Sequence, residues 1–367
     1  MSVVAYVSGH GLGHASREVQ ILRRLPGEIP LFVKTGSPAW FWESEISRPF
    51  TLIDESFDVG CVQRDSIRVD IDATRTAKHA MDVANRTRFE AERRWLESVQ
   101  AKVVVCDVAA FPLTVAASLG IPALLVANFT WSDIYAEYPG FEAINARLRA
   151  AYGHADLLLE AGLSLPMSYF AKRKSVGLVA RIGKDRRAEL VPLAPARGGK
   201  GVKLALIYAG NWGMPLAWER LKGFDDWHFL TLTPPGSVRP PNLTALPRGF
   251  LPHEDLVASV DLVVSKPGYG IVGECLASGT PLLYGPREEF AEYAALDAAL
   301  RAWPGGLKVS GEDFIQLKWK ETLDACPERG GVTRLPAPGA ESAARCIERV
   351  WRGTAPGNLD GVGGSGL

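Results

Sequence analysis

The chain has 367 residues, of which 47% are hydrophobic and 22% are charged, and its 41 basic and 41 acidic side chains give a formal charge of zero. A length of this order predicts about two domains, and the composition is typical of a globular protein with two cores. The neutral balance argues against a basic surface for nucleic acid or for a membrane, so we expect no nucleic-acid partner. The oligomeric state is left undefined.

The cysteines and the apolar runs indicate a cytoplasmic protein without an integral membrane segment. Five cysteines are scattered without C-x-x-C spacing, which favours reduced thiols over disulfides or a zinc site. The first residues form a strand-length apolar run without a basic segment, unlike a signal peptide. The longest apolar stretch is interrupted by Asp107, Pro112 and Pro122, so it predicts strand, helix and strand rather than a membrane span.

Short β-branched runs alternate with helix-length amphipathic segments, which is the pattern of a parallel sheet covered by helices. In the first half, the expected strands are residues 3–7, 31–34, 103–106 and 123–126, and the expected helices are 15–25 and 74–99. The pattern then restarts, with expected strands at 203–208, 229–232, 262–264 and 281–284. The sequence therefore predicts an α/β protein with two Rossmann-like, doubly wound parallel-sheet domains that face a central cleft.

A segment rich in proline, glycine, lysine and arginine separates the two halves. We predict an amino-terminal acceptor domain over residues 1–165, an interdomain linker over 166–200 and a carboxyl-terminal donor domain over 201–337. A helix is expected at 338–352. The glycine-rich residues 353–367 are expected to be disordered.

A loop rich in glycine and histidine, residues 8–14 (S-G-H-G-L-G-H), lies between the first expected strand and the first expected helix. Its spacing is G-x-G-x-G, and the second strand ends in K-T-G without an acidic residue, so an NAD site is not expected. Either both histidines satisfy local backbone groups, or one is a general base, because an imidazole accepts a proton near neutral pH. His10 and His14 lack the helical H-E-x-x-H context of a metal pair, and no metal or cofactor is predicted.

A second glycine loop follows an expected strand in the second half. Residues 263–274 read V-V-S-K-P-G-Y-G-I-V-G-E, so the strand leads into a helix whose free amide groups suit a diphosphate. Lys266 could balance phosphate charge, and Glu274 could accept hydrogen bonds from a ribose. Taken alone the pattern is weak, because glycine turns are common after strands and Glu274 could be a solvated helix residue.

At these residues the chain resembles glycosyltransferases of the GT-B fold. The second half is similar to the carboxyl domain of the peptidoglycan N-acetylglucosaminyltransferase family (glycosyltransferase family 28) in Gly268, Glu274 and residues 279–281 (G-T-P). The resemblance implies that Glu274 binds the donor ribose and that backbone groups of residues 249–251 contact the base. Residues 13–14 (G-H) match the end of that family's amino-terminal glycine loop.

Nearly the whole chain resembles the glycosyltransferase-like amino-terminal region of plant L-arabinokinases and related free-standing bacterial proteins. The shared stretches are residues 9–17, 59–63, 128–131, 134–138 and 266–274, with Asp65, Val69, Asp70 and Asp107. The resemblance covers no part of the GHMP kinase domain that follows in arabinokinases, so it implies no kinase activity.

Two features depart from the peptidoglycan family. Ile271 stands where that family has a hydroxyl residue, and the segment 287–292 (R-E-E-F-A-E) replaces a glutamine pair. In that family this segment usually holds the hydroxyl groups of the donor sugar. The resemblance therefore implies a nucleotide more strongly than it implies a particular sugar.

Several polar and aromatic residues of the first half admit two interpretations. Residues 70–72 spell D-x-D, the metal motif of a different glycosyltransferase fold, but they precede a long helix, and we expect a chance match. Gln63 and Asp65 either line the acceptor side or belong to a structured surface loop. Trp131, close to Asn128 after a strand end, either faces a sugar ring or packs in the core.

Together these features predict a metal-independent, inverting glycosyltransferase of the hexosyl or N-acetylhexosaminyl class, which moves a sugar from a UDP-linked donor to an unidentified hydroxyl acceptor. The catalytic candidates are His14 and, in second place, His10. The donor-side candidates are Phe250, Leu251, Lys266, Gly268, Tyr269, Gly270, Glu274, Arg287 and Glu292. The acceptor-side candidates are Gly11, Gly13, Arg17, Gln63, Asp65, Asp107, Asn128 and Trp131. Two alternatives stay open: a nucleotide-sugar 2-epimerase, and a non-catalytic sugar-nucleotide sensor.

Overall fold

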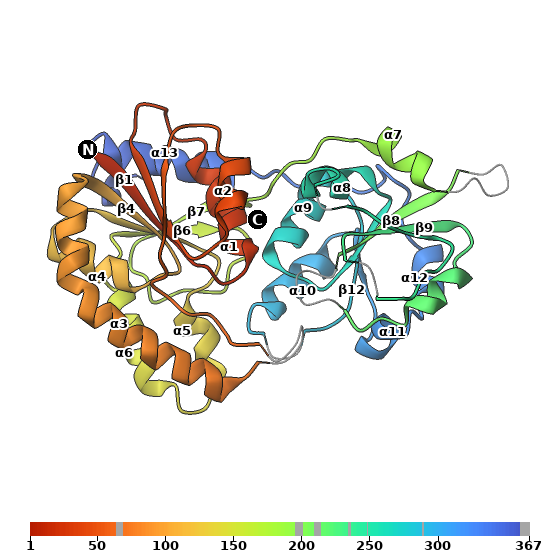
Figure 1. Ribbon diagram of the computed structural model, residues 1–367, viewed down its shortest axis with the longest axis horizontal. Helices are drawn as coiled ribbons and strands as arrows, with labels where there is room; N and C mark the ends of the chain where they lie inside the picture. The colour runs from red at the N-terminus through yellow and green to blue at the C-terminus, as the bar shows by residue number, and fades with distance from the viewer. Residues whose placement is uncertain are drawn as a thin grey trace. The chain divides into compact units, whose positions relative to one another are not determined.

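The structure, a computed structural model, describes residues 1–63, 69–194, 201–208, 214–233, 236–247, 249–287 and 290–359. The chain divides into two compact units, each built on its own parallel sheet (Figure 1). Unit 1 comprises the described residues of 1–64, 69–179 and 337–367, and unit 2 those of 180–336.

The sheet of unit 1 has seven parallel strands in the order β3-β2-β1-β4-β5-β6-β7. The strands are β1 (Ser2–Val7), β2 (Leu31–Thr35), β3 (Thr51–Asp54), β4 (Ala101–Asp107), β5 (Ala123–Ala127), β6 (Leu157–Ala161) and β7 (Arg173–Gly177). The chain proceeds from β1 to β2 and β3 on one side and then returns to β4 on the other side. The strand order therefore reverses between β1 and β4, where doubly wound sheets bind their ligands, beyond the carboxyl ends of the strands.

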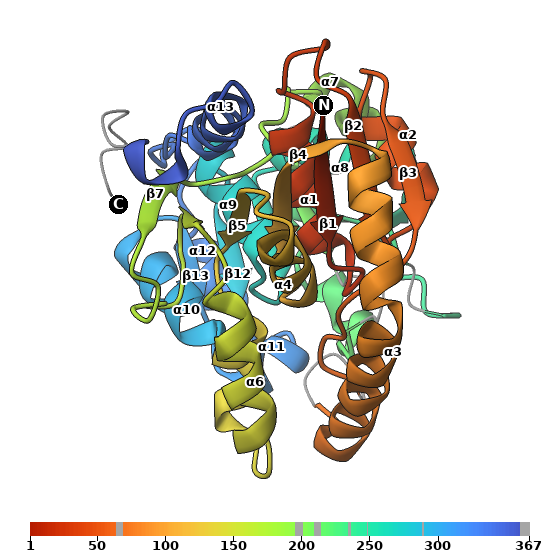
Figure 2. The same cartoon turned by 90° about the vertical axis from the view of Figure 1, so that its left-hand side faces the viewer.

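Helices cover both faces of this sheet, which Figure 2 shows with β1 and β4 beside each other. The helices are α1 (Leu12–Leu22), α2 (Ala39–Glu45), α3 (Ile71–Ser98), α4 (Phe111–Ser118), α5 (Trp131–Ile134), α6 (Glu142–Tyr152) and α13 (Gly339–Trp351). In β1, Val3, Ala5 and Val7 enter the core formed with α1, α2 and α13. The intervening Tyr6 reaches Glu92 of α3 on the opposite face. Burial on both faces explains the unbroken apolar run of β1.

The sheet of unit 2 has six parallel strands in the order β10-β9-β8-β11-β12-β13. The strands are β8 (Lys203–Tyr208), β9 (Trp227–Thr231), β10 (Leu243–Ala245), β11 (Leu262–Ser265), β12 (Leu282–Tyr284) and β13 (Gly306–Lys308). The helices are α7 (Arg187–Leu190), α8 (His253–Ser259), α9 (Tyr269–Ser278), α10 (Tyr293–Ala302), α11 (Gly311–Ile315) and α12 (Lys320–Asp324). Here the strand order reverses between β8 and β11, and the second glycine loop directly follows β11.

The expected domain limits differ from the two units in two places. The segment 166–200, expected to be a linker, contains β7, which pairs with β6 as a strand of unit 1, and α7, which belongs to unit 2. The expected carboxyl-terminal helix corresponds to α13, which belongs to unit 1 and packs there on β4, β7 and α1, although unit 2 precedes it in the chain.

The tail expected to be disordered over 353–367 is ordered where the structure describes it. Residues Pro356–Asn358 form a 3-10 turn, and Leu359 is buried in the core of unit 1. Lys174 Nζ donates a hydrogen bond to the Leu359 carbonyl at 2.7 Å. The high glycine content predicted disorder, but the buried side chain of Leu359 anchors the described part of this segment. Residues 360–367 lie outside the described residues.

No described helix is both long enough and apolar enough to cross a membrane.

Candidate functional site

The first glycine loop connects β1 to α1 at the reversal of strand order in unit 1. Gly11 precedes α1 with a φ of 75°, a left-handed conformation that glycine adopts without strain. A Cβ atom on Gly9 would lie 3.1 Å from the backbone of Gly36, so a larger residue at position 9 would push the two loops apart. A Cβ on Gly11 or Gly13 would meet nothing within 4 Å. The loop thus keeps open space beside the first turn of α1.

His14 lies in that first turn and pairs with Asp107, the last residue of β4. Its Nδ1 atom is 3.0 Å from each oxygen of the Asp107 carboxylate. His14 is 7% exposed and Asp107 is fully buried. When Nδ1–H donates its hydrogen bond to the carboxylate, Nε2 keeps its lone pair, so this arrangement suits a general base. The sequence suggested His14 as a base and Asp107 as an acceptor contact, but the pairing of the two depends on the fold.

Arg17, one turn further along α1, holds the same carboxylate from the other side. Its guanidinium pairs with Asp107 and also donates to the side-chain oxygen of Asn128, just after β5. Asn128 in turn donates to the Gly162 carbonyl at 2.6 Å. Burial alone would raise the pKa of Asp107, but the positive charge of Arg17 and the contact with His14 outweigh it and lower that pKa. Asp107 is therefore ionised behind His14.

Glu18 is a buried acid that the sequence analysis did not single out. It is fully buried, and its Oε1 accepts a hydrogen bond from Arg17 Nε at 3.2 Å. Burial, together with the nearby negative charge of Asp107, raises the pKa of Glu18 to about 8. One sequence signal could have identified it, because His14, Arg17 and Glu18 stand at positions i, i+3 and i+4 and so share one helix face.

Aromatic rings pack around the two histidines of the loop. The Trp131 ring lies 5.8 Å from that of His14 and 5.5 Å from that of His10, and its Nε1 donates to Asp58 at 2.7 Å. Trp131 is only 2% exposed, so of its two interpretations the structure favours packing over a sugar-facing surface. The His10 ring lies against Gly60, where a Cβ atom would come within 2.1 Å of it.

The acceptor-side candidates therefore separate into buried residues and residues beside open space. Arg17, Asp107, Asn128 and Trp131 are buried and support His14 rather than presenting a surface. Gly11 and Gly13 border open space. Gln63 is partly buried and forms an isolated antiparallel bridge with Val69. Asp65 lies outside the described residues.

The D-x-D of residues 70–72 has structural contacts in this chain. Asp70 caps α3, because its Oδ1 accepts a hydrogen bond from the Ala73 amide at an N···O distance of 3.0 Å. Asp72 forms an ion pair with Arg75. Among the described residues, no three His, Cys, Asp or Glu side chains are grouped so as to hold a metal ion.

In unit 2, Gly268 immediately precedes α9, whose first turn has no side-chain cap hydrogen bond, and the amino end of a helix favours an anion. Lys266, just before this turn, is partly buried, and burial with the nearby charge of Arg287 lowers its pKa to about 8. Arg287 stacks on Phe290, pairs with Glu292 at 3.7 Å and donates to the Pro267 carbonyl at 3.4 Å. Two cations thus lie near the amino end of α9.

Glu274 lies within α9 and is 2% exposed, so it is not the solvated helix residue considered as an alternative. Its Oε1 accepts from Arg181 Nη2 at 2.6 Å, and its Oε2 is 2.7 Å from His253 Nδ1. Burial would raise the pKa of Glu274, but the charges and hydrogen bonds of Arg181 and His253 lower it to about 2. The sequence analysis missed both partners, because they come from other segments.

The remaining donor-side candidates lie in the turn before α8 and in the first turn of α9. Phe250 is partly exposed and Leu251 is 9% exposed, in the turn that leads into α8. Tyr269 and Gly270 form the first turn of α9, and a Cβ atom on Gly270 would meet nothing within 4 Å. Their places are compatible with a ligand at the amino end of α9.

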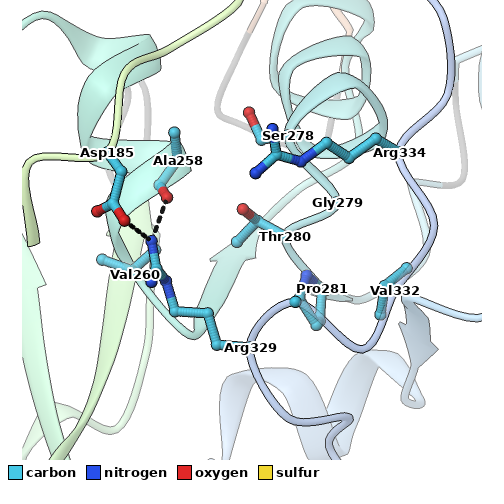
Figure 3. A pocket seen from close by; sticks show the side chains of 11 residues that line it. Asp185, Ala258, Val260, Ser278, Gly279, Thr280, Pro281, Arg329, Val332 and Arg334 are labelled. Carbon is cyan, nitrogen blue, oxygen red and sulfur yellow. Dashed lines mark hydrogen bonds and ion pairs between the residues drawn. The ribbon is translucent and has the colours of Figure 1, made fainter.

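One cavity of unit 2, of about 300 Å³, lies at the end of the sheet opposite to the second glycine loop (Figure 3). Its lining includes Val260 and Pro281, which precede β11 and β12, so it opens at the amino ends of the strands. In Figure 3, Arg329 points to Asp185 and to the Ala258 carbonyl, which it contacts at 2.7 and 3.1 Å. Arg329 thus contacts the last turn of α8. The cavity borders Ser278 at the carboxyl end of α9, whereas the donor-side candidates lie at its amino end, so the cavity is not part of the candidate donor site.

Solved structures similar to this chain include several glycosyltransferases. A UDP-glucosyltransferase from Polygonum tinctorium, capable of glucosylating indoxyl, superposes with a TM-score of 0.64 at 15% identity, covering 96% of this chain and 99% of its own. The calicheamicin glycosyltransferase CalG4 gives 0.59 at 16% identity, covering 98% and 96%. MurG of Acinetobacter baumannii gives 0.53 at 12% identity, covering 98% and 97%. The chain therefore has the GT-B fold, as its sequence predicted.

In sequence, the chain is similar to an L-arabinokinase of Arabidopsis thaliana, with 30% identity over 378 residues. The match covers 97% of this chain and 35% of the arabinokinase, so the chain spans about a third of that relative's length. No family model matches the chain.

Proposed function

We propose that the chain is a glycosyltransferase that moves a sugar from a nucleotide-diphosphate donor, UDP-linked, to an acceptor hydroxyl. The observation that carries the proposal is the His14–Asp107 pair at the reversal of strand order in unit 1 of a GT-B fold. The glycosyltransferase names of the similar structures support it. In this proposal unit 1 binds the acceptor and unit 2 binds the donor.

The base step follows from the orientation of His14. Its Nε2 accepts the proton of the acceptor hydroxyl while the acceptor oxygen attacks the anomeric carbon of the sugar and the nucleoside diphosphate leaves. A single displacement of this kind inverts the anomeric configuration. The ionised Asp107 stabilises the imidazolium that forms, and it keeps the ring oriented.

The donor half of the proposal rests on the amino end of α9. A diphosphate there would accept hydrogen bonds from backbone amides of the first turn, and the charges of Lys266 and Arg287 would stabilise it as it leaves. Contacts between the nucleobase of the donor and Phe250 and Leu251 stay predictions. A ribose that binds Glu274 would have to share or replace the contact that Arg181 or His253 makes with this carboxylate.

The test begins with a thermal-shift screen of nucleoside diphosphates and their sugars, followed by donor turnover with a panel of hydroxyl acceptors. His14→Ala should lower the transfer rate by roughly 10²–10⁴, the contribution of general-base catalysis, and leave the nucleotide Kd nearly unchanged. His10→Ala is the matched control in the same loop and should change the rate less.

Three outcomes would contradict the proposal. Turnover of the donor sugar without any acceptor indicates an epimerase. Tight nucleotide binding without turnover in any acceptor reaction indicates a sensor. Equal loss of nucleotide binding in both histidine variants would make the loop part of the donor site.

We also propose that transfer is independent of a divalent metal, because Asp70 and Asp72 are engaged as a helix cap and an ion pair. Transfer should persist in EDTA. Loss of transfer in EDTA, with recovery on addition of manganese, would assign these aspartates to a metal site instead.

A further inference from the structure

One buried cation is shared by two buried acids behind His14. Arg17 directs Nε to Glu18 and Nη2 to Asp107, and it is itself only 8% exposed. Glu18 Oε2 has no hydrogen-bond partner among the described residues. The rigid guanidinium therefore connects Glu18 to the carboxylate that His14 contacts.

With Asp107 ionised, the charges of this cluster balance in only two arrangements. If both acids are ionised and His14 is neutral, the buried group carries an excess negative charge, which the protein interior disfavours. The charge is balanced when Glu18 is un-ionised and His14 is neutral, or when Glu18 is ionised and His14 is protonated. Proton uptake by His14 and proton loss by Glu18 therefore favour each other.

We propose that Glu18 is a positioning residue for His14: acting through Arg17 and Asp107, it sets the proton affinity of the imidazole. An un-ionised Glu18 leaves the guanidinium committed to Asp107. An ionised Glu18 competes for Arg17 and adds negative charge, which strengthens the hold of His14 on its proton. This inference rests on the proposed role of His14 for its catalytic meaning, but the coupling itself can be measured without a substrate.

The other titratable groups around the cluster are few among the described residues. Asp58, from the segment after β3, faces the Trp131 indole, and burial raises its pKa. Cys106, next to Asp107 in β4, is buried, and burial raises the pKa of its thiol well above its usual range. His10 packs on Trp131 from the same loop as His14. An Asp58→Asn variant identifies any step that comes from Asp58.

The experiment is an NMR titration of the His14 ring nitrogens in ¹⁵N-histidine-labelled protein between about pH 5 and pH 10, with His14→Gln to assign the signals among six histidines. In the wild type, the ¹⁵N chemical shifts of the His14 ring should change in two steps, because coupled groups titrate in macroscopic steps. The alkaline step should lie near the pKa of Glu18, which is about 8. Glu18→Gln should abolish the alkaline step and leave a single step.

The matched control is Glu92→Gln, another buried glutamate of unit 1, which contacts Lys34 and Tyr6 and should keep both steps. A single-step curve in the wild type would overturn the inference even if Glu18→Gln failed to fold. Superimposable curves for the wild type and Glu18→Gln would overturn it as well.

The transfer assay separates this inference from the proposed function. If His14→Ala abolishes transfer while the Glu18→Gln and wild-type curves coincide, only the role of Glu18 fails. If the two-step curve appears but His14→Ala transfers sugar at the wild-type rate, the coupling stands and the base assignment fails.

Discussion

Glu18 and Glu274 are both buried glutamates next to an arginine, yet their pKa values shift in opposite directions. Glu18 has one hydrogen bond from Arg17, which it shares with Asp107, and burial dominates. Glu274 has two basic partners, and their charges outweigh burial. The number of partners, rather than burial alone, decides which glutamate is ionised at neutral pH.

Glu18 should make unit 1 less stable as the pH rises. Its folded pKa of about 8 lies above the unfolded value of 4.5, so the folded state binds more protons between these values. The stabilisation is complete below about pH 4.5 and is lost as the pH rises through about 8. Urea unfolding of Glu18→Gln at several pH values should lack this slope, which is about 1.4 kcal/mol per pH unit at most. Parallel slopes in the wild type and the variant would contradict this expectation.

Glu274 should have the opposite pH dependence. Its folded pKa of about 2 lies below the unfolded value of 4.5, so its stabilisation is complete above about pH 4.5 and is lost as the pH falls towards 2. At neutral pH, Glu274→Gln should destabilise unit 2 by about 1.5–3 kcal/mol, the usual contribution of a charged hydrogen bond. The exposed Glu321→Gln is the control.

The same Glu274→Gln variant tests the ribose assignment by calorimetry, well below its melting temperature. A weaker nucleotide affinity is expected. An unchanged affinity in a destabilised variant would show that Glu274 has only a structural role.

At the scale of elements, α1 places an ionisable network on a face that would ordinarily pack apolar side chains. His14, Arg17 and Glu18 occupy that face, while Val19 and Ile21 of the same helix enter the core. This arrangement is tolerated because β4 ends in Asp107 directly opposite the first turns of α1. The functional proposal therefore depends on one helix and one strand end.

Residues 180–187, with which unit 2 begins, are held along α8 by hydrogen bonds. The Lys184 amide donates to Asp255 at 2.7 Å, and the Arg186 amide donates to Ser259 Oγ at 2.7 Å. Gly183 lies so close that an added Cβ atom would come within 1.9 Å of the Glu254 carbonyl oxygen. The close approach requires glycine at this position.

Gly183→Ala should therefore destabilise unit 2 by about 1–3 kcal/mol, the usual cost of overpacking, because the segment must move away from α8. Thermal unfolding followed by circular dichroism measures the change. Gly223→Ala is the control, since a Cβ atom there would meet nothing within 4 Å. An equal melting temperature for the two variants would show that the segment yields without cost.

At the scale of the whole molecule, unit 1 is completed by residues from the end of the described chain. Ala343, Ala344 and Ile347 of α13 enter the same core as α1 and β1. In the sequence, residues 180–336 of unit 2 separate α13 from the part of unit 1 that ends at residue 179. Damage to α13 should consequently affect the site that contains His14.

Ile347→Ala should cost unit 1 about 2–5 kcal/mol, because Ile347 is fully buried and its truncation leaves a cavity. Hydrogen exchange should accelerate in β1 and β4 and stay unchanged in β8 and β11. The exposed Arg345→Ala serves as the control, with a change of about 0.5 kcal/mol or less. Faster exchange in unit 2 alone would contradict the assignment of α13 to unit 1.

The residue pattern was enough to predict the fold class and the two glycine loops. Strands with two buried faces, such as β1 and β11, are apolar apart from one terminal serine each, and glycine-rich turns follow them, so the local pattern was sufficient. The strands β3, β6, β7, β10 and β13 escaped prediction. In β3, β7, β10 and β13, partly exposed residues leave no continuous apolar run. In β6 the short run L-L-L is buried, but it was not predicted as a strand.

The tertiary structure alone decided which residues of these loops act together. Asp107 lies 93 positions from His14, and Arg181 lies 93 positions from Glu274, so no spacing rule connects them. Parallel strand order brings the end of β4 beside α1, and the segment 180–187 folds back along α8 to reach Glu274. A residue's charge and role depend on such neighbours, because burial and partner charges set its pKa, and the chain supplies these neighbours only when it folds.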